Sequence, residues 1–340
     1  MTAEELRGLV REQGLAGVSP PLLAMVSGGR DSTCLLDIAV ALLGPERVSA
    51  LHVNYGLRPA AGEDEEHCRE LCRQLGVELH VHTAGGERPA QTGGERPARA
   101  GVGRPAKAGA WQPAQGGNLQ AWARDVRYRE AARLAEERDA LFATGHTASD
   151  QVETIVYRLA ASPGRRALLG MPAREGRLVR PLLCVTREQT AAYCRERGLG
   201  WREDESNSDE RFARTRVREG VLPALRAVHS AADSNLLRTA ALLREETELL
   251  DGLVATELGG RRSIETAHLR ALPSALARMV VIHLAEDVAG TYVPQAGSRV
   301  GEILELDERG GRAELHIGGS VGAVVEGGVL EMVKLPPRPG

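Results

Sequence analysis

Short apolar runs alternate with amphipathic helical patterns over the first two thirds of the chain. Apolar runs bounded by turn residues predict buried strands at 22–26, 48–53, 77–81 and 140–144. Apolar residues at helical spacing predict helices at 3–13, 31–43, 63–75, 118–138, 149–160 and 186–198. Strands that alternate with helices predict an α/β fold with a doubly wound, mainly parallel, Rossmann-like sheet.

The pattern changes after about residue 216. Helical patterns at 232–258 and 268–289 precede short strands near 313–317, 321–326 and 329–333. The glycine pair in Glu326-Gly-Gly-Val329 predicts a hairpin turn between the last two strands. We therefore expect a first domain over 1–215 and a smaller C-terminal α+β accessory domain over 216–340.

A low-complexity segment at 84–117 interrupts the first domain. Gly85-Gly-Glu-Arg-Pro-Ala90 nearly recurs as Gly93-Gly-Glu-Arg-Pro-Ala98, and the segment is rich in Gly, Pro, Ala and Arg. Such a composition buries little apolar surface, so the segment is interpreted as an insertion.

Composition limits the partners, metal sites and cellular location to be expected. The net charge of −3 offers no overall polycation, so any RNA contact must come from local basic patches. Five cysteines without a C-x-x-C pair argue against a disulfide framework, a zinc site or an iron–sulfur site. No signal pattern and no long apolar run is present, so we expect a cytoplasmic protein without a membrane span.

The first apolar run ends in Ser27-Gly-Gly-Arg-Asp-Ser32, where a helix is expected to begin with Asp31 or Ser32 as its cap. A strand, a glycine turn and a helix start bring free N–H groups and a positive dipole end to one spot, which favours an anion. The spacing fits neither the GxxxxGK[ST] loop nor the G-x-G-x-x-G fingerprint of dinucleotide sites.

A second polar stretch, Gly145-His-Thr-Ala-Ser-Asp-Gln-Val-Glu-Thr154, follows the strand at 140–144. At helical spacing, His146, Asp150 and Glu153 share one face. Two carboxylates on one face can hold an ammonium group or a divalent metal, and can serve as a base. Because both stretches follow strands of one parallel sheet, we expect them to meet at its carboxyl edge.

The chain resembles the tRNA(Ile)-lysidine synthetases, a family of PP-loop ATP pyrophosphatases. The strings that carry this resemblance are Ser27-Gly-Gly-Arg-Asp-Ser32, His52-Val-Asn-Tyr-Gly-Leu-Arg58, Asn118-Leu-Gln-Ala-Trp-Ala-Arg-Asp-Val-Arg-Tyr128, Gly145–Thr154, Arg180-Pro-Leu-Leu183, Trp201-Arg-Glu-Asp-Glu-Ser-Asn207 and Arg214-Thr-Arg-Val-Arg218. The resemblance implies a C–N bond-forming ligase. ATP adenylates the carbonyl oxygen at carbon 2 of the wobble cytidine in CAU-anticodon tRNA(Ile); the ε-amine of free L-lysine then attacks that carbon, and AMP leaves.

The resemblance also implies roles for individual residues. The ATP-binding residues would be Ser27, Gly28, Gly29, Arg30, Asp31 and Ser32, with Asp31 a candidate Mg²⁺ ligand. Asp150 and Glu153 would bind the lysine ammonium, and Arg124 and Arg127 would stabilise charge near the adenylate. The candidates for substrate binding are His52, Asn54, Arg58, His146, Arg214, Arg216 and Arg218. For His52, Asn54 and Arg58 a structural turn role remains an equal alternative.

Two positions depart from the family pattern. Ser149 stands where a second acid is usual, and Ala161-Ser-Pro-Gly164 replaces an Arg-Gly-Ser-Gly turn, so Arg165 or Arg166 is a candidate substitute for the arginine. Three other readings remain open: a PP-loop tRNA sulfurtransferase, a small-molecule ligase that adenylates a carbonyl, and a non-catalytic nucleotide-binding protein. The oligomeric state is open too, a homodimer included.

Overall fold

The structure is a computed structural model that describes residues 1–15, 17–56, 61–84, 119–161, 164–202, 213–318 and 320–335. The described residues up to Ala240 form one compact unit and those from Ala241 form a second. Each unit has its own hydrophobic core. Arg58 and nearly all of the predicted insertion at 84–117 lie outside the described residues. The domain boundary at 215/216 stays a prediction.

A six-stranded sheet is the centre of the first unit. Its strands are β1 (Leu22–Met25), β2 (Val48–Asn54), β3 (Glu78–Thr83), β4 (Leu141–Ala143), β5 (Arg174–Glu175) and β6 (Leu178–Val179). They lie in the order β3-β2-β1-β4-β6-β5, and β1, β2, β3, β4 and β6 are parallel, whereas β5 runs antiparallel to β6. The predicted fold is therefore confirmed.

The position of β1 inside this order matters for function. The chain passes from β1 outward through β2 to β3 and then returns to β4, on the opposite side of β1. The direction of winding thus reverses between β1 and β4, and such a point leaves a crevice at the carboxyl ends of the two strands. Both polar stretches identified in the sequence start at this edge.

The helices of the first unit agree closely with the predicted ones. The α-helices are α1 (Ala3–Gln13), α2 (Arg30–Leu43), α3 (Ala61–Leu75), α4 (Leu119–Glu137), α5 (Ala148–Ala161), α6 (Arg187–Glu196), α7 (Ala213–Arg216), α8 (Leu222–Val228) and the start of α9 (Ala232–Leu258). Short helical turns lie at η1 (Pro45–Arg47), η2 (Arg165–Leu169), η3 (Pro181–Cys184) and the π-type η5 (Val217–Val221).

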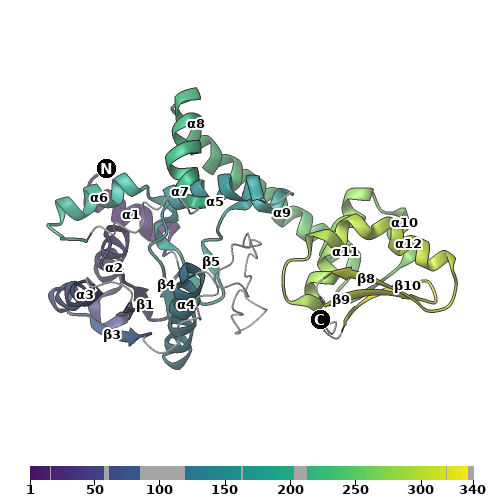
Figure 1. The fold of residues 1–340 in the computed structure, drawn as a ribbon, viewed down its shortest axis with the longest axis horizontal. Helices are drawn as coiled ribbons and strands as arrows, with labels where there is room; N and C mark the ends of the chain where they lie inside the picture. Colours follow the sequence, from purple (N-terminus) through teal and green to yellow (C-terminus); the bar gives the residue numbers. More distant parts are fainter. Residues whose placement is uncertain are drawn as a thin grey trace. The chain divides into compact units, whose positions relative to one another are not determined.

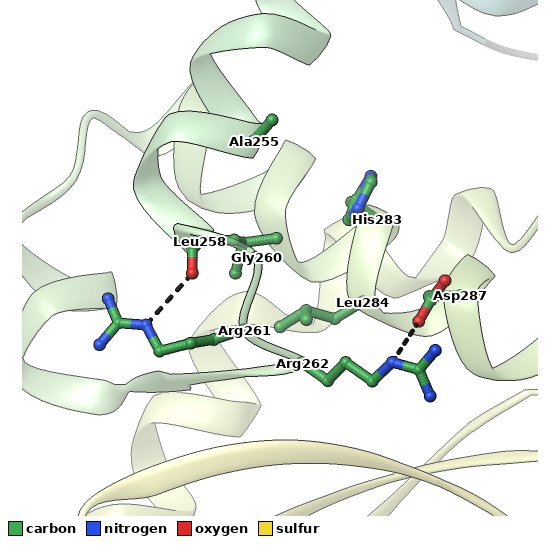
Figure 2. A pocket seen from close by; sticks show the side chains of 8 residues that line it. All are labelled: Ala255, Leu258, Gly260, Arg261, Arg262, His283, Leu284 and Asp287. Carbon is green, nitrogen blue, oxygen red and sulfur yellow. Dashed lines mark hydrogen bonds and ion pairs between the residues drawn. The ribbon is translucent and has the colours of Figure 1, made fainter.

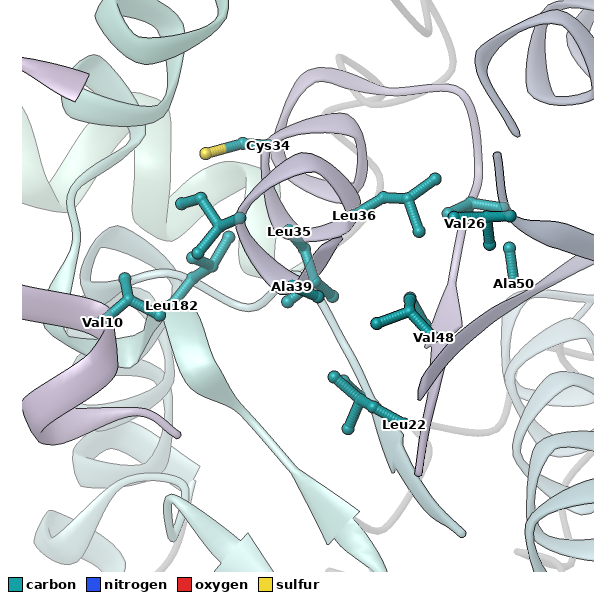
Figure 3. Packing of buried hydrophobic residues seen from close by; sticks show 14 of the residues in the cluster. Val10, Leu22, Val26, Cys34, Leu35, Leu36, Ala39, Val48, Ala50 and Leu182 are labelled. Carbon is teal, nitrogen blue, oxygen red and sulfur yellow. The ribbon is translucent and has the colours of Figure 1, made fainter. Parts of the chain in front are cut away.

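The core on one face of the sheet forms because alternate strand residues point to the same side. Leu22 and Val26 from the first strand segment and Val48 from β2 meet Leu35 and Leu36 of α2, as Figure 3 shows. Helices α1 and α6 complete this layer. On the opposite face Phe142 of β4 meets Tyr128 of α4 edge to face, with ring centroids 6.4 Å apart.

The second unit is an antiparallel sheet with helices. Its strands, β7 (Ser263–Glu265), β8 (Ala313–Gly318), β9 (Val321–Glu326) and β10 (Val329–Lys334), lie in the order β7-β10-β9-β8. Its helices are the end of α9, α10 (Thr266–Ala271), α11 (Ser274–Ala289), η6 (Pro294–Arg299) and α12 (Val300–Glu308). Helices α11 and α12 pack against the strands (Figure 1).

The hairpin predicted at Glu326–Val329 is confirmed, since Gly327 and Gly328 have φ angles of 57° and 75°. Such angles are those of a type I′ turn. The helical pattern at 268–289 forms two helices, because Pro273, which lacks an N–H group, separates α10 from α11. No helix in the described part of the chain has the length and apolar character needed to cross a bilayer.

Candidate active site

The loop between β1 and α2 presents the uncapped start of a helix. Gly28 has φ +80°, and Gly29 is the N-cap, so the expected cap at Asp31 or Ser32 is wrong. The Ser32 hydroxyl donates to the Gly29 carbonyl at 2.8 Å and accepts from the Ser27 N–H at 3.1 Å, which closes the loop. No side chain caps the helix at Gly29. Its first N–H groups therefore remain available to an anion.

The second polar stretch reaches the same place. A Cβ built on Gly145, just after β4, would lie 3.0 Å from the Asp31 carbonyl and 3.1 Å from the Ser32 nitrogen. Real Cβ contacts are rarely this close, so a side chain at position 145 would push the strand end away from α2. The structure thus brings together the two stretches that the sequence predicted to meet.

Arg187, at the first position of α6, joins the predicted carboxylates. Its guanidinium donates to Asp150 Oδ1 at 2.7 Å and to Glu153 Oε1 at 3.2 Å, and its Nε lies 3.9 Å from Asp31 Oδ2. Asp31 also accepts hydrogen bonds from Arg30 and from the Thr190 hydroxyl. Asp31, Asp150 and Glu153 thus surround one guanidinium, and we call these three residues the carboxylate cluster.

Two members of the carboxylate cluster, Asp150 and Glu153, have pKa values shifted in opposite directions. Burial raises the pKa of Asp150, but Arg187 and the backbone N–H of Thr147 outweigh it and leave the pKa below its usual value. Burial raises the pKa of Glu153, and Arg187 only partly offsets this, so that pKa stays above its usual value. Two carboxyl groups whose environments separate their pKa values can divide binding and proton transfer between them. Glu153 is the better proton acceptor of the pair.

His146 precedes α5 instead of lying on it, and its ring is fixed by Thr144. The Thr144 hydroxyl lies 2.7 Å from His146 Nδ1. Burial lowers the pKa of His146 to about 3, and the charges of Arg124 and Arg180 add to this effect. The negative charge of Asp150 raises the pKa, but by less. The imidazole is therefore neutral near pH 7, which favours positioning over acid catalysis.

The predicted Arg124 and Arg127 lie close enough to His146 for their charges to lower its pKa. The guanidinium of Arg124 lies 5.1 Å from the centre of the Tyr128 ring, and that of Arg127 lies 5.9 Å from it. Burial lowers the pKa of Arg124, and the nearby charges of Arg214, Arg127 and Arg180 lower it further. Like charges held together in this way form a site for an anion.

The remaining predicted arginines come from the segment after α6. Arg218 lies near enough to Glu153 to lower the pKa of that carboxyl group, and it forms an ion pair with Glu219 at 3.4 Å. Arg216 is exposed. The buried Val217 packs with Val152 and Val156 of α5, so this segment is anchored beside the cluster.

His52 and Asn54 support the loops around the site. The buried His52 lies with Nδ1 3.0 Å from the Val26 carbonyl, at the exit of β1. Asn54 donates to Glu65 at 2.8 Å and accepts from the Gly56 N–H at 2.9 Å. These contacts favour the structural alternative for both residues, and their part in substrate binding stays a prediction.

The sequence patterns missed Arg187, Thr190 and Gln151. Gln151 binds both backbone groups of Met171, donating to the carbonyl at 2.8 Å and accepting from the N–H at 2.6 Å, and so fixes the turn after η2. One signal could have revealed Arg187: a cation in the first turn of a helix opposes the helix dipole. Its position therefore implies a partner elsewhere in the fold.

The second unit carries a surface pocket that is unrelated to the predicted residues. Ala255 and Leu258 of α9, the turn Gly260–Arg262, and His283, Leu284 and Asp287 of α11 line it, as Figure 2 shows. Arg262 pairs with Asp287 at 3.2 Å, and Arg261 donates to the Leu258 carbonyl at 3.1 Å. Its charged groups are largely satisfied within the protein, unlike the free helix start at Gly29.

Comparison with known proteins gives the family. The PP-loop domain model matches residues 12–225. The tRNA(Ile)-lysidine synthase of Methylobacterium sp. is 33% identical over 347 residues, covering 96% of this chain and 92% of that protein. That of Pseudomonas fluorescens is 34% identical over 278 residues, covering 76% of this chain and 57% of that protein.

Length and structure comparisons add two facts. The chain spans only 48% to 66% of the length of several other curated relatives. The U34-tRNA thiolase of Methanococcus maripaludis shares the fold, with a TM-score of 0.52 and 15% identity over 71% of this chain and 78% of that one. With a PP-loop domain and a close relative along nearly its whole length, the chain belongs to the tRNA(Ile)-lysidine synthase family.

Proposed function

We propose that this chain is a ligase that makes lysidine. It would use ATP to adenylate the oxygen at carbon 2 of the wobble cytidine in CAU-anticodon tRNA(Ile), with release of pyrophosphate. The side-chain amine of free L-lysine would then attack that carbon, and AMP would leave. The observation that supports this most is the meeting of Asp31 from the loop with Asp150 and Glu153 around one cation.

The phosphates of ATP suit the free N–H groups at the start of α2. Mg²⁺ usually binds through one or two carboxylates together with substrate phosphates. Asp31, in the first turn of α2, fits this pattern as a single carboxylate beside the phosphate site. Among the described residues, no group of three metal-ligating side chains forms a cage of its own. A bound ion would neutralise the leaving pyrophosphate.

The other residues divide between the two substrates. Asp150, with its lowered pKa, holds the lysine ammonium, and Glu153, with its raised pKa, accepts the proton that the amine loses on attack. Arg124, Arg127 and Arg214 lie together where the negative charge of the adenylated base or a tRNA phosphate would be stabilised.

The cysteines argue against sulfur transfer. Burial raises the pKa of Cys68 to about 12 and the pKa values of Cys72 and Cys184 to about 11, so these thiols are poor nucleophiles. Five free cysteines, four of them buried, suit a reducing cytoplasm. A homodimer remains to be tested by light scattering.

The test is incubation with CAU-anticodon tRNA(Ile), ATP, Mg²⁺ and labelled lysine, followed by mass spectrometry of the nucleosides. We expect lysidine from the wild type and none from Asp31→Ala or Asp150→Ala. Asp233→Ala, which removes a carboxylate on α9 that pairs with Arg226, serves as the control and should retain wild-type yield. Sulfur incorporation, or ATP turnover without tRNA, would refute the proposal.

A further inference from the structure

Arg187 is held in place by both its backbone and its side chain. Its backbone N–H donates to the Ser149 hydroxyl at 3.1 Å, so the residue that replaces an acid of the family pattern anchors the arginine. Its side chain is 26% exposed and reaches Asp150, Glu153 and Asp31 with different nitrogens. The guanidinium thus occupies the place where the proposed function puts a substrate ammonium.

The carboxylate of the lysine substrate needs a cation near the carboxylate cluster. Free lysine brings a carboxylate as well as its amines, and a carboxylate is repelled by Asp31, Asp150 and Glu153 unless a cation faces it. When an ammonium takes over the oxygens of Asp150 and Glu153, the N–H donors of Arg187 lose their partners. They are then free for the carboxylate that enters with that ammonium.

We propose that Arg187 is the specificity-determining residue that recognises the α-carboxylate of the amino acid. In the free protein its guanidinium neutralises the carboxylate cluster. When lysine binds, the guanidinium turns to the substrate carboxylate, and the fork of a guanidinium matches a carboxylate with two parallel hydrogen bonds. The inference rests on the proposed function, because it assigns a role at the lysine site.

The other arginines near the site are less suited to this task. Arg180 is buried and already donates to the Pro172 carbonyl at 2.7 Å and to Glu175 at 3.1 Å. Arg124 and Arg214 are assigned to the adenylated base, and the charges that lower the pKa of Arg124 are those of Arg214, Arg127 and Arg180. Arg187, by contrast, forms ion pairs with both Asp150 and Glu153.

The test compares L-lysine with cadaverine, a diamine that has the carbon chain and both amino groups of lysine but no carboxylate. The kcat/KM for each amine is measured with tRNA and ATP, or cadaverine is measured as a competitive inhibitor if it does not react. In Arg187→Gln we expect kcat/KM for lysine to fall by about tenfold or more, which corresponds to about 1.4 kcal/mol. Cadaverine should bind equally well or better, because the competing guanidinium is gone.

Two further variants make the result decisive. Arg187→Lys keeps the charge but loses the fork, so its preference for lysine should lie between those of the wild type and Arg187→Gln. Arg195→Gln, on the exposed face of the same helix, should keep the wild-type preference. Thermal unfolding of each variant reports folding, and Arg187→Lys carries the test if Arg187→Gln does not fold.

The outcomes separate the inference from the function. If the wild type makes lysidine but Arg187→Gln loses activity with both amines equally, Arg187 is only structural and the inference is wrong. An unchanged preference for lysine in that variant would equally place the carboxylate elsewhere. If the wild type makes no lysidine, the proposed function itself fails.

Discussion

The carboxylate of Asp37 joins three helices of the first unit, and its loss should be measurable as lost stability. Asp37 lies on α2, is 2% exposed, and accepts hydrogen bonds from Tyr193 and Arg197 of the α6 segment and from Arg7 of α1. Asp37→Asn keeps the shape but removes the charge that the two guanidinium groups face. The same change loosens the contact of α2 with α6, the helices that carry Asp31 and Arg187.

The size of the effect follows from the burial of the partners. Removing one member of a buried ion pair costs about 3–5 kcal/mol. The side chains of Arg7 and Arg197 are 24% and 42% exposed and regain part of their hydration, which favours the lower end of that range. We therefore expect a loss of about 3 kcal/mol, or about 6–12 °C in the Tm of a unit of this size.

Thermal and urea unfolding of the first unit, followed by circular dichroism, measure this loss. Glu78→Ala removes an exposed ion pair with Arg138 at 2.8 Å, and should cost at most about 1 kcal/mol. An equal loss in the two variants, or a loss below about 1 kcal/mol in Asp37→Asn, would refute the reasoning.

The same variant should show a pH dependence of known sign. Burial alone would raise the pKa of Asp37, but the hydrogen bonds from Arg197, Tyr193 and Arg7 hold it below its usual value. A carboxyl group with a lowered pKa stabilises the fold above its unfolded pKa of about 3.9 and loses that effect as the pH falls through its folded pKa. The difference between wild type and Asp37→Asn should therefore be full near pH 7 and shrink below about pH 4.

Three further results are expected. Gly145→Ala places a methyl group 3.0 Å from the Asp31 carbonyl and should cost about 1–3 kcal/mol and nearly all lysidine formation, whereas Gly8→Ala, with open space around it, should cost neither. Gln151→Ala leaves both backbone groups of the buried Met171 without partners, and should lower the free energy of unfolding by about 2–4 kcal/mol in urea melts. Because burial lowers the pKa of His146 to about 3, the unfolded chain binds a proton there near pH 6.5 and the folded chain does not. The contribution of His146 to stability should thus fall as the pH drops below about 6.5, and His146→Asn should remove that slope.

The local features of the fold could be predicted because they depend on neighbouring residues. The period of the apolar pattern and the turn residues predicted β1, α2 and the hairpin at Gly327–Gly328. The strands β5 and β6 were missed because two residues each are too few to show alternation. The helical pattern at 268–289 did not show the break at Pro273, because the apolar pattern continues through it.

The candidate site also has parts that could be predicted from the sequence and parts that could not. The two stretches that meet at the sheet edge could be found because each follows a strand and carries its own polar pattern. Arg187 was missed: its place in the first turn of α6 implies a partner but does not identify it, and Asp150 and Glu153 lie 37 and 34 residues earlier in the chain. The cap at Asp31 or Ser32 was wrong because both side chains form other hydrogen bonds, Asp31 with Thr190 and Ser32 with Gly29.

The pairing of β1 with β4 affects which changes in chain length the protein can tolerate. Leu22 pairs with Leu141 and Ala24 with Ala143, so hydrogen bonds between neighbouring strands join the two halves of the site. Insertions or deletions on the way from β3 to α4 should therefore leave the register of β1 against β4 unchanged, and a nick there should leave two fragments able to reassociate.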